Sequence, residues 1–241
     1  MTVFWRAVNK VIKDSDIVLE VLDARMIDET RNKEIEDKIK KEGKQIIYVI
    51  NKCDLISQAH AEMKKKELFP CVFISSKERL GTKMLREKIL RYANKEQVKV
   101  GVVGYPNVGK SSIINVLKGV GSAKTSPESG YTKGIQHVRM SNRILLIDTP
   151  GVIPYKEKDE SKLGKIAAKN FDVIKDPEGV AIQVIEENPD FIRKTYGIKY
   201  DSDAEKTLED IALKFNKLIK GGMPDTIQAA KIVLKDWQRG R

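Results

Sequence analysis

Residues 98–117 read VKVGVVGYPNVGKSSIINVL. The apolar run 98–103 predicts a buried strand, and the stretch that begins at Gly109 predicts a helix. Between them, residues 104–111 fit the pattern G-x-x-x-x-G-K-[ST], in which glycines let backbone amides turn toward phosphate groups. A strand, this loop and a helix in succession predict a nucleotide site in an α/β fold. The expected phosphate-binding residues are Asn107, Val108, Gly109, Lys110, Ser111 and Ser112.

A second nucleotide motif lies upstream of this loop. Asn51-Lys52-Cys53-Asp54 fits N-K-x-D and closes an apolar run that predicts another strand. The Asp54 carboxylate can accept hydrogen bonds from N1 and from the exocyclic amine of guanine, which adenine does not offer. Ser75-Ser76-Lys77 follows the next apolar run and suits a contact with the guanine carbonyl oxygen. Both motifs stand at the carboxyl ends of expected strands, where parallel sheets bind their ligands.

Two residues suit a magnesium ion beside the terminal phosphate. The hydroxyl of Ser111 is placed to ligate Mg²⁺, and Asp148 opens Asp148-Thr149-Pro150-Gly151, which fits D-x-x-G. In this motif the aspartate holds Mg²⁺ through water, and the amide of Gly151 reaches the γ-phosphate. The sequence therefore predicts a GTP site with bound magnesium.

A polar, glycine-containing segment separates the phosphate loop from the D-x-x-G motif. Within it, Thr132 can complete the Mg²⁺ shell only when the γ-phosphate is present, and we prefer it to Thr125. Residues 121–134 and 149–160 are therefore the expected switch segments, ordered by GTP and released on hydrolysis.

The first 150 residues alternate short apolar runs with amphipathic stretches, which predicts an α/β domain over 1–155 with a mostly parallel six-stranded sheet. The expected strands are Ile17–Leu22, Gln45–Ile50, Cys71–Ile74, Val98–Val103, Ile135–Met140 and Ile144–Ile147. The expected helices cover about residues 3–13, 31–42, 57–67 and 82–93, and a further helix starts at Gly109.

From Ser161 onward the chain shows only helical periodicity, so we expect a separate all-helical domain over 156–241. Pro177, Pro189 and Pro224 each follow a capping or loop residue and predict helix starts. Gly221-Gly222 is expected to close a helix over about 204–220.

The last expected helix, about 225–239, carries two stripes of side chains. The apolar stripe, expected to face the core, contains Ile227, Ala230, Leu234 and Trp237. The adjacent stripe contains Gln228, Lys231, Lys235 and Arg239. The three basic residues are candidate contacts to RNA phosphates, with a solvated face as the alternative.

Composition is that of a soluble globular protein, with 41 % hydrophobic and 33 % charged residues among 241. No run approaches the ~18 apolar residues of a membrane span, so we expect a cytoplasmic monomer without a membrane partner. Cys53 and Cys71 are too few for a disulfide framework or a zinc site.

The net charge of +11 is concentrated in the first domain, because residues 1–155 hold 28 basic against 18 acidic side chains. Residues 156–241 hold 17 against 16. A basic field of this kind favours a polyanionic partner such as RNA, with a solvated lysine-rich face as the alternative.

The order of the motifs is reversed, because an ordinary GTPase has its phosphate loop before N-K-x-D. In this respect the chain resembles the circularly permuted GTPases of the YlqF/RbgA ribosome-assembly family, including its archaeal members. The matching elements are Asp23-Ala24-Arg25, Arg31-Asn32, Asn51–Asp54, Ser75–Lys77, Gly104–Ser112, Gly130–Thr132 and Asp148–Gly151. The resemblance implies a permuted GTPase domain over 1–155, a helical domain over 156–241 that binds ribosomal RNA, and GTP-dependent docking on a maturing ribosomal subunit.

Two departures from the family pattern are visible. Met26-Ile27 stands where members often carry proline, and the Gly-His-Met that bacterial members carry before the first strand is absent from the sequence. The histidine of that motif is implicated in hydrolysis. His60 and His137 are expected to be structural or solvent-exposed rather than catalytic.

The residues around the γ-phosphate predict slow hydrolysis. Val152 stands where Ras-type enzymes have a water-orienting glutamine, and an apolar side chain cannot polarise water. Asn107 resembles the asparagine that coordinates K⁺ in potassium-stimulated GTPases, where the ion stabilises developing charge, with Thr132 and Gly151 in support. The alternative is that Asn107 only shapes the loop.

The sequence thus predicts a GTPase switch in ribosome assembly. The second interpretation is an RNA-binding scaffold that uses GTP for structure and hydrolyses it negligibly. The third, a GTPase in metal-ion transport or signalling, lacks a membrane segment or lipid signal. Because the D-x-x-G motif continues into the helical domain through residues 152–162, we also expect the γ-phosphate to bias the position of that domain.

Overall fold

The chain divides into two compact units, Met1–Glu157 and Lys158–Arg241. The boundary expected after residue 155 lies two residues before this division. The structure is a computed structural model, and it describes residues 3–118, 136–149, 151, 153–154, 157, 159–166, 168 and 170–240.

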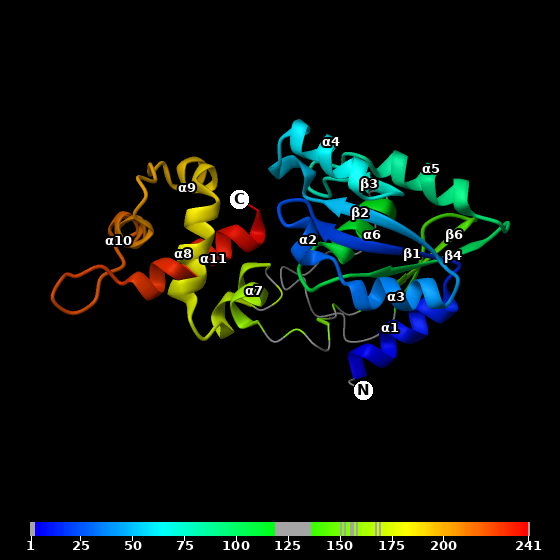
Figure 1. The fold of residues 1–241 in the computed structure, drawn as a ribbon, viewed down its shortest axis with the longest axis horizontal. Coiled ribbons are helices and arrows are strands. Elements are labelled where there is room, and N and C mark those ends of the chain that lie inside the picture. The colour runs from blue at the N-terminus through cyan, green and yellow to red at the C-terminus, as the bar shows by residue number, and fades with distance from the viewer. Residues whose placement is uncertain are drawn as a thin grey trace. The chain divides into compact units, whose positions relative to one another are not determined.

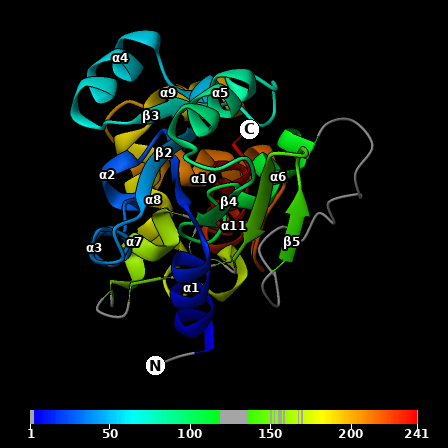
Figure 2. The ribbon, with the colours of Figure 1, turned by 90° about the vertical axis from the view of Figure 1, so that its right-hand side faces the viewer.

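The first unit is built on one six-stranded sheet with the strand order β3-β2-β1-β4-β6-β5. Its strands are β1 (Ile17–Asp23), β2 (Gln45–Asn51), β3 (Cys71–Phe73), β4 (Val98–Val103), β5 (Gln136–Arg139) and β6 (Ile144–Asp148). Only the edge strand β5 runs antiparallel to its neighbour. Figure 2 shows β3 and β5 at opposite edges of the sheet. The predicted mostly parallel, six-stranded sheet is confirmed.

Helices cover both faces of this sheet. They are α1 (Val3–Asp14), α2 (Ile27–Thr30), α3 (Lys33–Lys41), α4 (Gln58–Glu67), α5 (Thr82–Tyr92) and α6 (Lys110–Lys118). In Figure 1, α1 and α3 lie on one side of the sheet and α5 lies on the other. Buried side chains join α1 and α3 to the central strands: Trp5, Val8, Ile12, Val18, Ile35, Ile39 and Val103. Burial of such apolar surface is what holds the layers together.

The register of the sheet aligns the carboxyl ends of its strands. Asp23 of β1 pairs with Asn51 of β2, and Val102 of β4 pairs with Asp148 of β6. Asp23, Asn51 and Asp148 therefore stand together at the carboxyl ends of three strands. The phosphate loop follows β4 at the same end of the sheet, because β1, β2, β4 and β6 run parallel.

The second unit contains the helices α7 (Glu160–Lys165), α8 (Pro177–Glu187), α9 (Pro189–Tyr196), α10 (Ala204–Lys214) and α11 (Thr226–Arg239). Pro177 and Pro189 are the first residues of their helices, as predicted, because proline lacks only an amide that a helix start leaves unpaired. Asp176 caps α8 by accepting a hydrogen bond from the amide of Gly179.

Polar contacts inside the second unit hold α11 against its neighbours. The Trp237 indole donates to the carbonyl oxygen of Lys165 over 2.9 Å, and the Tyr196 hydroxyl lies 3.1 Å from the Asp236 carboxylate. Ala230, Leu234 and Trp237 are buried, as their stripe predicts. None of the helices in the described ranges is long and apolar enough to cross a membrane.

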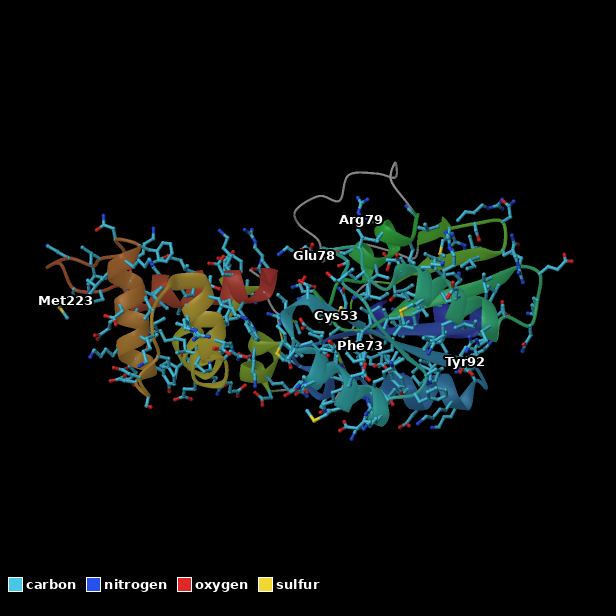
Figure 3. All side chains as sticks on the ribbon, turned by 90° about the horizontal axis from the view of Figure 1, so that it is seen from above. Cys53, Phe73, Glu78, Arg79, Tyr92 and Met223 are labelled. Carbon is cyan, nitrogen blue, oxygen red and sulfur yellow. The ribbon has the colours of Figure 1, made fainter. Side chains whose placement is uncertain are left out.

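Three details of the second unit correct the sequence predictions. The helix α10 ends at Lys214 rather than near residue 220, and residues 217–225 form a short hairpin. Pro224 pairs with Leu218 in an isolated bridge of this hairpin instead of starting a helix. Ile227 is 49 % exposed although its stripe predicts burial. Met223, at the same hairpin, points away from the helices (Figure 3).

Candidate nucleotide site

The loop between β4 and α6 has the backbone that a phosphate loop requires. Gly104 and Gly109 have φ of +142° and +98°, values that L-residues rarely adopt. A Cβ at Gly104 would lie 2.5 Å from the carbonyl oxygen of Val21, so β1 passes directly behind the loop. Asn107 has φ +60°, a left-handed conformation that asparagine tolerates better than most residues. These conformations aim successive amides into one concavity, which suits a phosphate.

Lys110 is enclosed by this loop. Its side chain is 7 % exposed, and its Nζ donates to the carbonyl oxygens of Gly104 and Tyr105 over 3.2 and 2.6 Å. Burial lowers the pKa of Lys110 to about 8, and the nearby charge of Asp148 opposes this shift. A buried ammonium without a full counter-charge is stabilised by an incoming polyphosphate, because the ligand supplies the missing negative charge.

Asn51 joins three segments that are far apart in the sequence. Its Nδ2 donates to the carbonyl oxygen of Val108 over 2.9 Å, and its Oδ1 accepts from the amide of Ser76 over 3.2 Å. The fit is close, since a Cβ at Gly109 would lie 2.1 Å from Asn51 Nδ2. The end of β2, the phosphate loop and the 75–77 segment are thereby brought together, as the sequence predicts.

The turn after β2 presents Asp54 to solvent. Lys52 has φ +62°, a left-handed conformation that costs a lysine about 1–2 kcal/mol. The amide of Cys53 then donates to the carbonyl oxygen of Ile74 over 3.1 Å, which ties the turn to the end of the neighbouring strand. Asp54 is exposed in the 3₁₀ turn Cys53–Leu55 and is available for a ligand.

The 75–77 segment begins a tight loop. Ser75 is buried and exchanges two backbone hydrogen bonds with Leu80, while its Oγ accepts from the amide of Glu78 over 3.0 Å. Lys77 lies exposed beyond this closed loop. In Figure 3, Cys53, Glu78 and Arg79 lie toward one end of the sheet, and Tyr92 lies toward the other. The candidate guanine contacts therefore gather at the end where the strands terminate.

The D-x-x-G segment lies against the phosphate loop. A Cβ at Gly151 would come within 2.7 Å of the backbone of Pro106, so the two segments touch. The Thr149 hydroxyl donates to the carbonyl oxygen of Val102 over 2.7 Å and anchors the segment to β4. The first expected switch segment, residues 121–134 with Thr132, lies outside the described residues, and so do residues 150, 152, 155, 156 and 158 of the second.

Ser111 and Asp148 have the character of a magnesium site. Ser111 stands in the first turn of α6, and Asp148 ends β6 with 4 % of its surface exposed. Within the described ranges no group of three or more histidine, cysteine, aspartate or glutamate side chains could hold a metal ion by itself. This donor set fits Mg²⁺, which retains several waters and is held by one or two protein oxygens together with substrate phosphates.

A sequence profile described as 50S ribosome-binding GTPase matches residues 99–219, which is half of the chain. The chain belongs to the 50S ribosome-binding GTPase family. Because N-K-x-D precedes the phosphate loop, it is a circularly permuted member, as the motif order predicts.

Relatives of known sequence span nearly all of this chain. A GTP-binding protein of Methanocaldococcus jannaschii is 42 % identical over 98 % of this chain and 65 % of its own length. Nucleolar GTP-binding protein 2 of Yarrowia lipolytica is 37 % identical over 98 % of this chain and 49 % of its own length. The chain therefore spans about half to two thirds of the length of these relatives.

Solved structures of YlqF from T. maritima have a similar fold. The GNP-bound form is 26 % identical, with a TM-score of 0.67 over 98 % of this chain and 93 % of that one. The GDP-bound form is 25 % identical, with a TM-score of 0.68 over 97 % of this chain and 94 % of that one. The expected P-loop GTPase fold is confirmed.

One cluster of charged residues beside the site has no role that the sequence predicts. The Asp23 carboxylate, at the end of β1, forms ion pairs with Arg25 and with Lys52 of the N-K-x-D motif. The available signal was a charged residue at the end of an apolar strand, followed by a cation two residues later. In the family pattern, Asp-Ala-Arg marked the resemblance without indicating what it contacts.

Proposed function

We propose that this protein is a slow GTPase that acts as a GTP-dependent switch in ribosome assembly. Its GTP-bound form would bind ribosomal RNA or a pre-ribosomal subunit and release it after hydrolysis. Membership of the 50S ribosome-binding GTPase family supports the general activity. The names of the yeast-type relatives, nucleolar GTP-binding protein 2, agree with a place in ribosome biogenesis.

One contact supports the nucleotide assignment best. The hydrogen bond from Asn51 to the carbonyl oxygen of Val108 joins the base-recognition turn to the phosphate loop at 2.9 Å. A base and a polyphosphate can then be bound by one continuous site. Asn51, Lys52, Cys53, Asp54, Ser75, Ser76 and Lys77 form the base side in this proposal.

Guanine selectivity is assigned to the exposed carboxylate of Asp54. Asp54→Asn should reverse the preference of the site from guanine to xanthine nucleotides, because xanthine presents a carbonyl oxygen where guanine presents an amine. Displacement of a bound fluorescent nucleotide by GDP and by XDP measures this preference. An Asp54→Asn variant that still prefers GDP would contradict the assignment.

No side chain is assigned a catalytic role in this proposal, and the residues of the site would instead hold cations. Ser111 and Asp148 would hold Mg²⁺, and Thr132 would join them when the γ-phosphate is present. Asn107 would hold K⁺, which is supported by its place in the phosphate loop and its resemblance to the asparagine of potassium-stimulated GTPases. Mg²⁺ and K⁺ would stabilise the charge that develops on the transferring phosphoryl group.

Ribosomal RNA is the proposed partner of the helical unit. Lys231 and Lys235 are half-buried on α11 and Arg239 is exposed, so their charges can reach a phosphate backbone. The net charge of +11 lies mostly in residues 1–155, so it favours a polyanionic partner for the protein as a whole rather than for the helical unit in particular. The γ-phosphate contact of Gly151 would favour the RNA-binding state, so the RNA affinity should be higher with a GTP analogue than with GDP.

GTP turnover in K⁺ and in Na⁺ buffer, with and without each purified ribosomal subunit, tests the proposal. Stimulation by one subunit would establish the switch and identify its partner. Tight GTP binding with near-zero turnover under every condition would instead support the RNA-binding scaffold, for which Val152 is the observation in the sequence.

A further inference from the structure

A buried carboxylate lies directly beneath the base-recognition turn. Asp23 is 1 % exposed, and its Oδ2 lies 2.8 Å from Lys52 Nζ and 2.7 Å from Arg25 Nη2. Its Oδ1 accepts from both the amide and the Nε of Arg25, over 3.1 and 3.0 Å. Both oxygens of this carboxylate are therefore engaged by cations, one of which belongs to the N-K-x-D motif.

The position of Asp23 is fixed by the fold around it. Asp23 pairs with Asn51 in the parallel register of β1 and β2, and the amide of Ala24 donates to the carbonyl oxygen of Asn51 over 2.8 Å. On its other side, the amide of Asp23 donates to Thr30 Oγ1 over 3.1 Å. Thr30 is itself buried and donates to the carbonyl oxygen of Met26 over 2.6 Å. These backbone contacts thus fix the position of Asp23 independently of its ion pair with Lys52.

The charges of the cluster favour the ionised form of Asp23. Burial alone raises the pKa of Asp23, but the charges of Arg25 and Lys52 outweigh it and hold this pKa well below its usual range. Burial likewise lowers the pKa of Lys52, and the charge of Asp23 opposes that shift. Removing the Asp23 charge would leave two cations in a largely buried place, which is strongly unfavourable.

We propose that Asp23, oriented by Arg25, is a positioning residue for guanine specificity that acts by holding Lys52 in its left-handed conformation. Lys52 immediately precedes the 3₁₀ turn that carries Asp54. A change of its backbone would rotate that turn and displace the Asp54 carboxylate. The proposal rests on the proposed guanine contact of Asp54.

The effect should fall on the base more than on the phosphates. Asn51 is attached to the phosphate loop and to the 75–77 segment through its own side chain, independently of Lys52. Without the Asp23 ion pair, the phosphate side therefore stays tied to β2 while the turn beyond it loosens. A purely structural role for Asp23 would weaken all nucleotides alike.

Inosine and guanine nucleotides separate these outcomes, because hypoxanthine lacks only the exocyclic amine that Asp54 would bind. The experiment measures dissociation constants of fluorescent GDP and IDP for the wild type and for Asp23→Asn. GDP affinity should fall about tenfold, as expected for loss of a hydrogen bond to a charged group, and IDP affinity should fall less. The ratio of GDP to IDP affinity should therefore fall about threefold or more.

Asp28→Asn is the matched control. It removes a carboxylate five residues away that pairs with Lys64 over 2.7 Å but is 62 % exposed, so the affinity ratio should stay at the wild-type value. Asp23→Glu is the second variant and is used if Asp23→Asn does not fold. It keeps the charge but moves the carboxylate by one methylene, and it should lower the ratio in the same direction.

An unchanged GDP-to-IDP ratio in the folded Asp23 variant would overturn the positioning role. The Asp54→Asn variant shows whether the guanine contact of Asp54 has failed or only the positioning role of Asp23. Reversal toward XDP in Asp54→Asn together with an unchanged ratio in the Asp23 variant removes only the positioning role. Persistent GDP preference in Asp54→Asn removes the guanine contact, and the positioning role with it.

Discussion

The side-chain amide of Asn51 donates to the carbonyl oxygen of Val108 over 2.9 Å, although the two residues stand 57 positions apart. Asn51 ends β2 and Val108 follows β4, and these strands are not neighbours, because β1 lies between them. The asparagine side chain therefore reaches past the end of β1 to the phosphate loop. Reversed chain order leaves this contact intact, since a site depends on where strands end in space and not on their sequence order.

Asn51→Ala should weaken GDP and GTP together. The substitution removes the hydrogen bonds to Val108 and Ser76 and separates the base turn from the phosphate loop. We expect nucleotide affinity to fall roughly tenfold to a hundredfold, as expected for the loss of one buried and one partly buried hydrogen bond. Titration with fluorescent GDP measures the change, and the exposed Asn94→Ala is its control. A loss of less than about twofold would contradict the linking role of Asn51.

Gly109→Ala should disrupt the site by a steric clash. A methyl group at this position would stand 2.1 Å from Asn51 Nδ2, on a backbone with φ +98°. Gly43→Ala is a matched control, because Gly43 has φ +62° and its added methyl group meets nothing within 4 Å.

Gly43→Ala should lose only the backbone contribution, about 1 kcal/mol of unfolding free energy, and keep the wild-type affinity for GDP. Gly109→Ala should lose more stability than the control and bind GDP poorly. Urea unfolding and nucleotide titration measure the two quantities. Equal behaviour of the two variants would show that the clash relaxes at little cost.

Glu20→Gln should remove a pH dependence of stability that originates in the middle of β1. Glu20 is fully buried, and its Oε1 accepts from the amide of Asn32 over 2.8 Å. Burial raises the pKa of Glu20 to about 8, with a smaller contribution from the charge of Glu36. The carboxyl group is therefore protonated in the folded protein at neutral pH and ionised in the unfolded chain.

Stability from this group is fully present below the unfolded pKa of about 4.5 and is lost as pH rises toward about 8. Glu20→Gln should have the unfolding free energy of the wild type near pH 4.5. Near pH 8 it should exceed that of the wild type by roughly 2–4 kcal/mol. Urea unfolding across this range measures the difference, and the exposed Glu96→Gln should follow the wild type. Parallel curves for Glu20→Gln and wild type would contradict the assignment.

Alanine at Lys231, Lys235 and Arg239 together should weaken ribosomal RNA binding and flatten its salt dependence. Removing one phosphate-binding cation should reduce the magnitude of the slope of log K against log salt by about 0.7–0.9, so the triple variant should reduce it by about 2–3. Filter binding at several salt concentrations measures it. The control removes three exposed lysines elsewhere in the helical unit: Lys194, Lys199 and Lys206. Equal slopes for the two triple variants would place the RNA on another surface.

The strands could be predicted closely because their signal is local. The run Ile17–Leu22 became β1 over Ile17–Asp23, and Gln45–Ile50 became β2 over Gln45–Asn51. Each of these two strands extends one polar residue beyond the predicted range. Apolar runs report burial, whereas the extra residue is in the strand because a neighbouring strand pairs with it.

The helix boundaries that failed are ones that tertiary contacts decide. Residues 215–220 continue a helical pattern, yet the chain leaves α10 at Lys214, and the amide of Lys217 returns to the carbonyl oxygen of Ala212. The four-residue α2 was missed because so short an element has no periodicity to detect. Its contribution is the Thr30 hydroxyl, which meets Asp23.

The sequence by itself determined the class of fold, the positions of the nucleotide motifs and the permuted order in which they occur. These depend on neighbours along the chain, through glycine conformations, apolar periodicity and the ends of strands. The tertiary structure alone decided that Asn51 reaches Val108, that Asp23 lies beneath Lys52, and that Glu20 is buried. Such contacts follow from the lateral order and register of the strands, which no local pattern specifies, because many strand orders bury the same apolar runs equally well.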